Sequence, residues 1–398
     1  MPWSESRVFE VFAVFLRLGL TSFGGPIAHL GYFREEFVAR RAWLDDARYA
    51  QLLAICQFLP GPASSQMGFS VGLLRAGWPG AFAAFLGFTL PSALLMLAFA
   101  GFSVWLSSGV GAALAHGLML VAIAVVAHGL LGMVRRLTPD APRIAIAVLA
   151  AVLVLWIGTG WAQLLAIALG AVAGSWLRRG ATEAAMAPLP LHYGPRLSMV
   201  LMACFAIALV AALLWPSQSP SMPAMAAAFY RAGALVFGGG HVVLPLLESS
   251  LVDSGWIAPD AFLASYGAAQ AVPGPLFSIA AGLGAQAPTG SSPLVSAGVA
   301  LVAIFLPGLL LVSAVLPVWQ RVSAWRGAAP ALAGINAAVV GLLAAALYTP
   351  LWTDGVRGWG DIAIVAIALT LLLRLRNGAM WAVGWCAAAA LAAHWLLQ

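Results

Sequence analysis

Apolar stretches long enough to cross a membrane occupy most of this sequence, and they constrain its fold more than any other feature. Two of the clearest run over residues 80–106 and 110–134, and a helix needs about 20 apolar residues to span a bilayer. Only 8% of the residues are charged and 63% are hydrophobic, whereas a soluble domain has about 25% charged residues. We therefore expect an integral membrane protein made of helices, because helices satisfy their own backbone hydrogen bonds in lipid.

The few charged and thiol-bearing residues exclude several kinds of chemistry. All 19 basic residues are Arg and none is Lys, which excludes a Walker A loop and a Schiff-base lysine. Cys56, Cys204 and Cys386 have no CxxC spacing, so neither disulfides nor a zinc site is indicated. The net charge of +6 is assigned to cytoplasmic loops and not to nucleic-acid binding. A membrane-embedded enzyme would need a nucleophile–base pair or a metal cluster in the bilayer, so we expect no enzyme, no cofactor and no metal.

The sequence contains an internal repeat. Residues 15–31 and 229–245 are identical at seven of seventeen positions, and each copy contains a Phe-Gly-Gly segment. Further matches follow in the same order: Trp43 with Trp256, Gln57 with Gln270, Pro60-Gly61-Pro62 with Pro273-Gly274-Pro275, Ser65 with Ser278, and Leu90-Pro91 with Leu306-Pro307. This pattern indicates a duplicated unit of the kind from which many membrane transporters are built.

Arg-rich loops in one copy correspond to Arg-poor loops in the other. The loop at 31–48 holds four Arg residues, whereas its counterpart at 248–261 holds no Arg and three acidic residues. Because Arg-rich loops stay on the cytoplasmic side, the two copies are expected to have opposite orientations. The expected divisions are an N-terminal repeat, a linker with an orientation-switching span, and a C-terminal repeat, at residues 1–177, 178–223 (span 197–215) and 224–398.

The Gly and Pro motifs predict helical hairpins. Residues 49–75 leave and return on the Arg-rich side, because Arg75 follows the loop at 31–48 with too few residues for two full spans. Pro60-Gly61-Pro62 would form the tip of this hairpin, since Pro and Gly break a helix. Residues 8–30 could form a similar hairpin or one full span. The fold class is thus an all-α polytopic membrane protein, with two inverted-topology repeats whose broken helices and hairpins meet near the membrane midplane.

The other apolar stretches predict ordinary membrane spans. They are 80–106, 110–134, 143–158, 161–177, 197–215, 293–318, 330–350, 361–373 and 379–397.

Broken helices at symmetric positions indicate a central site for an anion. A helix that starts at membrane depth presents unpaired N–H groups and a positive dipole end, and both bind anions. Ser64, Ser65 and Ser278 follow the two Pro-Gly-Pro motifs, and their hydroxyls would suit an oxyanion. The alternative is that these motifs are packing kinks and that the Ser hydroxyls bond back to their own helix.

Arg17 and Arg231 occupy matching positions within apolar stretches, where a guanidinium is costly unless it has a role. The pair could present two cations to a dianion, or each could snorkel or pair with Glu10 or Glu248. Gln57 and Gln270 could donate amide hydrogen bonds to the same ligand or could join helices.

Three residues are candidates for coupling to protons, although each has a structural alternative. They are His29, His241 and Glu248; a packed interfacial His and a solvated loop acid are the competing interpretations. The candidate substrate-binding residues are Arg17, Arg231, Gly24, Gly25, Gly238, Gly239, Gln57, Gln270, Pro60, Gly61, Pro62, Ser64, Ser65, Pro273, Gly274, Pro275 and Ser278.

At these motifs the sequence resembles the chromate ion transporter (CHR) family in its long-chain, two-domain form. The matching segments are 18–26, 41–44, 59–65, 237–245, 255–257 and 270–275. The resemblance implies chromate efflux across the bacterial inner membrane, commonly tied to chromate resistance, with sulfate as a candidate competitor. The loop at 246–255 departs from the family in lacking basic residues, which agrees with an inverted second copy.

The expected function is secondary transport of chromate by alternating access, in which one repeat rocks against the other and a proton gradient drives the cycle. The alternative is another tetrahedral oxyanion such as sulfate or molybdate, because N–H groups and Arg do not distinguish the central atom. The expected partners are the anion, the lipid bilayer and a coupling proton; the oligomeric state is left open, with a homodimer as one option. A scaffold protein is disfavoured, because symmetric broken helices would be costly without a site.

Overall fold

The computed structural model forms only helices in the part of the chain that it describes. The described residues are 5–23, 25–102, 109–157, 160–177, 189, 191, 193–215, 219–237, 242–319, 328–375 and 378–396. No strand occurs within these ranges, which confirms the predicted all-α fold. Among the described residues, five helices are long and apolar enough to cross a membrane, so the chain is a multi-pass membrane protein.

The chain reverses its direction between the first two helices. They are α1 (Glu5–Thr21) and α2 (Gly25–Arg34), and the π-helix η1 (Glu35–Arg40) continues α2. The ring centre of Phe15 lies 5.7 Å from that of Phe33 and 5.1 Å from that of Phe37. These contacts require α2 to run back along α1. Residues 8–30 therefore form the hairpin and not the single span.

A second hairpin follows in the first copy of the repeat. Its arms are α3 (Asp46–Phe58) and the first part of α4 (Ala63–Gly101). The helical backbone of α4 breaks at Ala76 and Gly77, so this arm ends at Arg75. The guanidinium of Arg75 lies 5.0 Å from the ring centre of Trp43, which precedes α3. Both ends of the segment thus lie at the same end of the molecule, as the sequence predicted.

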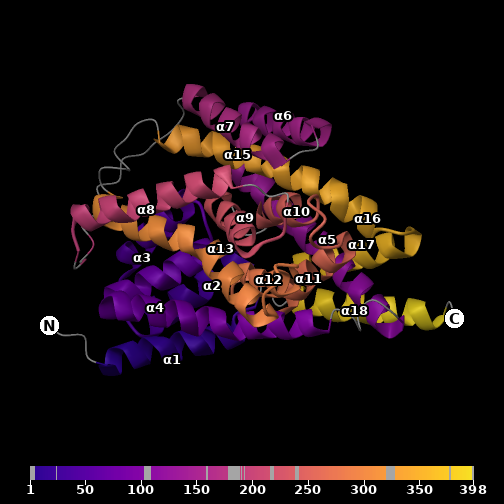
Figure 1. The fold of residues 1–398 in the computed structure, drawn as a ribbon, viewed down its shortest axis with the longest axis horizontal. Helices are drawn as coiled ribbons and strands as arrows, with labels where there is room; N and C mark the ends of the chain where they lie inside the picture. The colour runs from indigo at the N-terminus through magenta and orange to yellow at the C-terminus, as the bar shows by residue number, and fades with distance from the viewer. Residues whose placement is uncertain are drawn as a thin grey trace.

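The second copy of the repeat forms matching elements. They are α9 (Met222–Leu235), α10 (Val243–Leu251), α11 (Pro259–Ala271), the 3-10 turn η4 (Leu276–Ser278), α12 (Ile279–Gln286), α13 (Pro293–Val315) and η5 (Leu316–Val318). α3 and α11 each have 13 residues, and they begin at matching positions of the repeat. Pro307 lies inside α13 as Pro91 lies inside α4. In Figure 1 the short helices α9 to α12 lie in the middle of the molecule, among the longer helices.

The remaining helices correspond to the predicted spans. They are α5 (Gly109–Leu137), α6 (Ala141–Ile157), α7 (Gly160–Leu177), α8 (Pro195–Leu214), α15 (Ala328–Ala346), α17 (Trp359–Arg374) and α18 (Gly378–Leu396), with the short η6 (Leu347–Trp352) and α16 (Thr353–Gly355) after α15. α15 packs on α6 and α7 of the first copy, and α5 packs on α17 and α18 of the second. Small residues allow these crossings: Gly334 meets the backbone of Gly170, and Gly117 meets that of Cys386.

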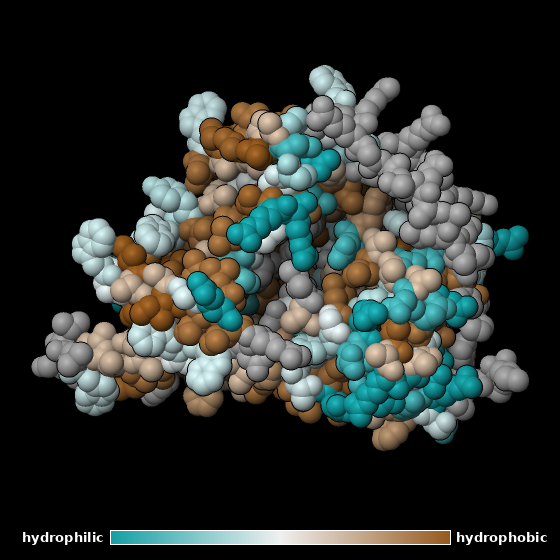
Figure 2. Space-filling view, turned by 180° about the vertical axis from the view of Figure 1, so that it is seen from behind, coloured by the Kyte–Doolittle hydropathy of each residue, from teal (hydrophilic) through white to brown (hydrophobic). Residues whose placement is uncertain are grey.

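Apolar side chains cover much of the outer surface. Trp156 and Trp176 are 85% and 82% exposed, and α8 is mostly exposed along its length. Figure 2 shows hydrophobic residues over much of one face, a hollow near the middle, and hydrophilic residues gathered at the end where α1 begins. This distribution is typical of a protein surrounded by lipid with a charged face at one membrane boundary.

Candidate functional site

Each Pro-Gly-Pro tip donates a hydrogen bond to the opposite copy of the repeat. The N–H of Gly61 donates to the carbonyl of Val236 at 2.7 Å, and the N–H of Gly274 donates to the carbonyl of Ser22 at 2.9 Å. Ser22 and Val236 occupy matching positions directly before the two Phe-Gly-Gly segments. The hairpin tip of each copy is therefore held next to the helix break of the other copy.

Close packing of the two tips explains why glycine occupies both positions. Gly61 has a φ of 117°, and a Cβ there would lie 3.0 Å from the Cα of Gly308. Gly274 has a φ of 101°, and a Cβ there would lie 3.0 Å from the Oγ of Ser92. Ser92 and Gly308 are matching residues, because each follows the Leu-Pro pair of its copy.

These contacts correct one prediction about the anion site. The N–H groups of Gly61 and Gly274 were expected to be free for a ligand, but both are already bonded to a carbonyl. The buried tip needs a fixed backbone partner, because an unpaired N–H group away from water is costly. The N–H groups without a partner in the described part of the chain are those of residues 63–65, in the first turn of α4.

The first turn of α4 contains polar groups without a hydrogen-bond partner in the described part of the chain. Pro62 caps this helix without a side-chain hydrogen bond to its first turn, and the N–H groups of residues 63–65 have no partner in the described part of the chain. The hydroxyl of Ser65 is buried and lacks a hydrogen-bond partner there. Ser64 is also buried. A buried polar group without a partner is uncommon in a folded protein, so this turn is a good candidate for ligand contact.

The corresponding turn of the second copy is different. The hydroxyl of Ser278 donates to the carbonyl of Pro275 at 2.7 Å, so this Ser bonds back to its own turn, as the alternative interpretation held. The turn is a short 3-10 helix, η4, and not the start of a long α-helix. Of Ser65 and Ser278, only Ser65 therefore keeps a free hydroxyl.

Gln66 joins the two copies, although the sequence analysis did not select it. Its Nε2 donates to the carbonyl of Pro60 at 2.9 Å and to that of Gly308 at 3.1 Å. Its Oε1 is buried and has no partner among the described residues. Gln66 is a polar residue in the first turn after a Pro-Gly-Pro motif, which could have indicated its role. The matching residue of the second copy is Ile279, so a comparison of the two copies does not select Gln66.

The paired amides Gln57 and Gln270 have different surroundings. Gln57 is exposed near the end of α3. Gln270 interacts with the hydroxyl of Tyr266, and its buried Nε2 lacks a hydrogen-bond partner within the described ranges. Gln270 therefore has a free donor three residues before the tip that starts at Pro273.

The two matching Arg residues do not occupy equivalent environments. Arg17 is exposed on α1, and it lies near enough to Glu36 for its charge to help lower the pKa of that carboxyl group. Its predicted alternative partner, Glu10, instead pairs with other Arg residues. Arg231 is half-buried on α9, and no ion pair to it is found among the described residues. Arg231 is thus the better placed of the two to need an anionic ligand.

A polar cluster of four residues lies beside the tip of the second copy. Nε2 of His29 donates to the carbonyl of Ser22 at 3.2 Å, which is the carbonyl that accepts from Gly274. The Nδ1 of His29, the Oγ of Ser22 and the Oγ1 of Thr89 are buried without partners in the described chain, and the Oγ of Ser92 donates to the carbonyl of Thr89. The matching residues beside the other tip are Val236, Val243, Phe305 and Gly308. Only one of the two junctions therefore carries this polar cluster.

Several predicted residues lie outside the described part of the chain, and others are placed without a clear ligand role. Gly24, Gly238, Gly239 and His241 lie outside it. Gly25 begins α2 with a φ of 75°. Glu248 is half-buried on α10, in a stretch that the sequence analysis treated as a loop. Within the described residues, no group of three or more His, Cys, Asp or Glu side chains could hold a metal ion.

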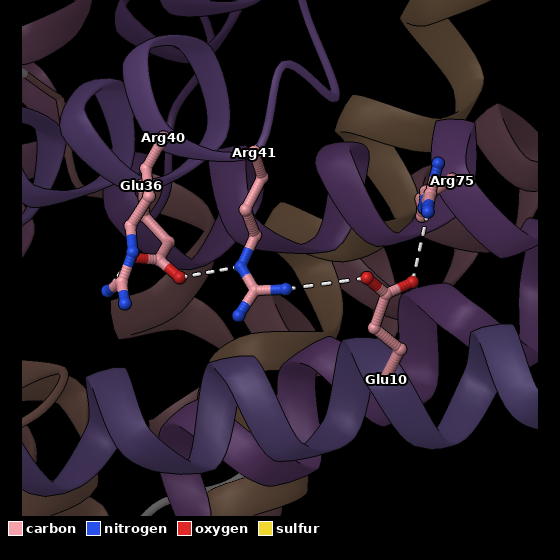
Figure 3. Close-up of polar contacts among 5 residues, drawn as sticks. All are labelled: Glu10, Glu36, Arg40, Arg41 and Arg75. Carbon is pink, nitrogen blue, oxygen red and sulfur yellow. Dashed lines mark hydrogen bonds and ion pairs between the residues drawn. The ribbon is translucent and has the colours of Figure 1, made fainter.

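A network of ion pairs fixes the charged end of the first copy (Figure 3). Glu36 accepts from Nε of Arg41 at 2.6 Å and pairs with Arg40 at 3.3 Å. Glu10 pairs with Arg41 at 3.4 Å and with Arg75 at 3.0 Å. Burial alone would raise the pKa of Glu36, but the hydrogen bond and charge of Arg41 outweigh it and lower that pKa. This network ties α1, η1 and the base of the α3–α4 hairpin together.

One further buried pair joins the copies. Nε2 of His116 on α5 lies 3.0 Å from Oδ1 of Asp361 on α17, and both side chains are largely buried. The sequence alone does not predict this pair, because the two residues lie far apart along the chain.

These features together define a class of protein. It is an α-helical, multi-pass membrane protein built from two copies of a unit with broken helices. The hairpin tip of each copy contacts the helix break of the other copy, next to buried polar groups that have no partner among the described residues. Such an arrangement is typical of membrane transporters. The chromate transporter family model matches residues 9–175 and again 223–393. The chain belongs to the chromate transporter family.

Named relatives agree with this assignment. The chain is 30% identical over 355 residues to a chromate transport protein of Pseudomonas aeruginosa, covering 84% of this chain and 79% of that protein. It is 29% identical over 350 residues to a chromate transport protein of Cupriavidus metallidurans, covering 84% and 80%. It is 28% identical over 359 residues to a probable chromate transport protein of Synechococcus elongatus, covering 84% and 82%. No solved structure matches the chain.

Proposed function

We propose that this chain is a secondary transporter that exports chromate across the inner membrane of a bacterium. Membership of the chromate transporter family and the relatives' names support chromate as the substrate. The absence of Lys excludes a Walker A nucleotide site within the chain. The energy for export then comes from ion gradients and the membrane potential. A negative-inside potential favours exit of a dianion by about 2.3 kcal/mol per charge per 100 mV.

The observation that carries the proposed site is the reciprocal pairing of the hairpin tips, Gly61 with Val236 and Gly274 with Ser22. It brings helix breaks from both copies together next to buried donors that have no hydrogen-bond partner among the described residues. We assign the anion to the first turn of α4, where Ser65 and the free N–H groups would donate to its oxygens. The amide of Gln270 and the guanidinium of Arg231 would complete the site. Arg17 has a lesser role here, because its side chain is exposed.

The two copies have inverted orientations in this proposal, with the Arg-rich end of the first copy in the cytoplasm. The ion-pair network of Glu10, Glu36, Arg41 and Arg75 supports this orientation, because it gathers cations at one end as cytoplasmic faces do. The exchange of α5 and α15 between the copies is the packing expected when two matching units are related by a two-fold axis. Transport then proceeds by alternating access to the site.

Proton coupling is assigned to His29. Its Nε2 donates to a carbonyl, so the neutral ring leaves Nδ1 as a bare proton acceptor, which is buried without a partner among the described residues. A proton bound there would be stabilised by a nearby dianion and costly without one. Proton and anion would thus bind together. Replacement of His29 by Gln is expected to make chromate flux insensitive to an imposed proton gradient.

The experiment is chromate uptake into everted vesicles, with and without a proton gradient. We expect Arg231→Gln to reduce uptake strongly and Arg17→Gln to reduce it much less. Unchanged uptake in the double variant Arg17→Ala, Arg231→Ala would refute the assignment of Arg to the site. Excess sulfate or molybdate should compete if the site recognises any tetrahedral dianion, because N–H groups and Arg do not contact the central atom. Absence of competition would assign selectivity to groups other than those named here.

A further inference from the structure

The helices form two bodies, and neither body corresponds to one copy of the repeat. The core body consists of the hairpins and their following helices, α1 to α4 and α9 to α13, which pack mainly on one another, except that α11 packs mainly on α5 of the arm body. The arm body consists of α5, α6, α7, α15, α17 and α18, in which helices of the two copies are exchanged. The boundary between these bodies therefore crosses both copies. Figure 1 shows α6, α7 and α15 at one edge of the molecule and α17 and α18 at another, with the short core helices between them.

The arm body packs tightly on the hairpin of the second copy. α5 lies along α11, and a Cβ at Gly267 would collide with the backbone oxygen of Leu118. Leu263 and Tyr266, on the same face of α11, are 1% and 0% exposed. The neighbouring α10 also contacts the arm body, since Nε2 of Gln163 on α7 donates to the carbonyl of Pro245 at 3.1 Å.

The matching face in the first copy is open. The repeat matches Leu263, Tyr266, Gly267 and Gln270 of α11 with Ala50, Leu53, Ala54 and Gln57 of α3. Ala50 and Gln57 are exposed, and Leu53 and Ala54 are half-exposed. In the described part of the chain, no arm-body helix packs extensively on α3 or α2. The same stripe of one helix face is thus closed in one copy and open in the other.

The sequence also identifies the residue that would close the open face. Gly117 of α5 and Gly334 of α15 correspond to each other. Gly117 is the residue at which α5 crosses α18 of the second copy, and Gly334 is the residue at which α15 crosses α7 of the first copy. The residues that follow them are Leu118 and Ile335. Since Leu118 closes on Gly267, its counterpart Ile335 is the residue that would close on Ala54.

From this asymmetry we infer that the arm body tilts on the core body, exchanging the Leu118–Gly267 contact for an Ile335–Ala54 contact. This inference rests on the proposed function in one respect, since it names the motion that gives alternating access to the tips. The moving boundary lies between the two bodies and not between the two copies of the repeat. The structure is the state that is open along α3. Because α3 starts at the Arg-rich end, where Arg34 pairs with Asp46, the open side faces the cytoplasm in the proposed orientation.

Two substitutions should bias this exchange in opposite directions. Gly267→Leu leaves no room for α5 on α11 and so favours opening of that side. Ala54→Leu is accommodated in the present state, because that face is open, but it obstructs the approach of α15. Gly298→Leu is the matched control, because a Cβ at Gly298 meets open space on an exposed face.

The experiment measures thiol labelling in a chain with Cys56, Cys204 and Cys386 replaced. Ala50→Cys and Leu263→Cys serve as probes, at matching positions that are not in the proposed anion site. A membrane-impermeant maleimide is applied to everted and to right-side-out vesicles. The expected result is rapid labelling of Ala50→Cys in everted vesicles and slow labelling of Leu263→Cys from either side.

The biasing variants decide the outcome. Gly267→Leu should raise labelling at position 263 in right-side-out vesicles several-fold and lower it at position 50, Ala54→Leu should do the reverse, and Gly298→Leu should do neither. Labelling that rises at both probes, or that does not respond to either variant, would overturn the inference. If Gly267→Leu fails to fold, the inference is still tested by Ala54→Leu, which should lower the labelling at position 263. If labelling at the two probes changes in opposite directions but the parent chain carries no chromate flux, only the proposed function is refuted. If the parent chain transports chromate but labelling at the two probes does not change in opposite directions, only the inferred tilt of the arm body is refuted.

Discussion

Gly61→Ala perturbs the junction between the two copies more selectively than any larger change. The N–H of residue 61 is still present in this variant, so the substitution does not itself remove the donor to the carbonyl of Val236. The added methyl group has two costs. One comes from the backbone, because a φ of 117° is strained for any residue with a Cβ. The other comes from contact, because the Cβ would lie 3.0 Å from the Cα of Gly308.

The size of both costs follows from the geometry. Holding a non-glycine residue in a sparsely populated backbone region costs about 1–3 kcal/mol. Overpacking against a backbone atom that cannot rotate away adds about 1–3 kcal/mol. The sum is roughly 2–6 kcal/mol of unfolding free energy, unless the tip retracts and loses its hydrogen bond. In either case the tip is displaced from the other copy, so chromate flux should fall together with stability.

The assay is equilibrium unfolding in mixed detergent micelles, paired with chromate uptake in everted vesicles. Gly290→Ala is the matched control, because Gly290 has a φ of 76° but open space around a Cβ. It should cost only the backbone strain, about 1–2 kcal/mol, and leave uptake unchanged. If Gly61→Ala proved no more destabilising than Gly290→Ala, the close packing of the tip against the other copy would be refuted.

Three further predictions concern the contacts that support this junction. Gln66→Leu removes one hydrogen bond across it, to the carbonyl of Gly308, and one within the tip, to the carbonyl of Pro60, so unfolding free energy should fall by about 1–3 kcal/mol; an unchanged value in micelles would contradict the bridging role. Glu36→Gln should cost about 1.5–3 kcal/mol at neutral pH. Because the pKa of Glu36 is lowered in the folded state, that difference from the parent chain should be full above the ordinary Glu pKa and vanish as pH falls through the lowered one; a difference that grew on acidification would contradict the sign. Gly334→Ala should destabilise the crossing of α15 and α7 by several times more than Gly298→Ala, measured in the same unfolding assay, and equal effects would contradict that crossing.

The helices and hairpins could be predicted because each has a local cause. The length of each apolar stretch predicts a membrane span, and Pro and Gly residues predict where a helix breaks. Because the unit is repeated, each element is predicted a second time from the other copy. The agreement of α3 and α11 in length and position follows from that duplication. Charge placement also predicted that Arg75 returns to the end where Trp43 lies.

The details of the site could not be predicted, because they depend on contacts between the copies. Whether the N–H of Gly61 is free or bonded depends on Val236, which is far away in the sequence. The same holds for Gln66 and for the pair of His116 and Asp361. The repeat itself misled at Ser278, because equal residues in matching positions suggested equal roles, and the hydroxyl of Ser278 bonds to its own turn.

The central claim is that an oxyanion binds at the start of α4, where the two copies meet. Chromate uptake by the purified protein in proteoliposomes, measured as a function of chromate concentration, tests it most directly with the variants Ser65→Ala and Ser278→Ala. Ser65→Ala should raise the KM for chromate several-fold, because the hydroxyl has no protein partner among the described residues. Ser278→Ala should leave the KM near that of the parent chain, because its hydroxyl is already satisfied. Equal KM values for the two variants, or a larger rise with Ser278→Ala, would contradict the proposed site.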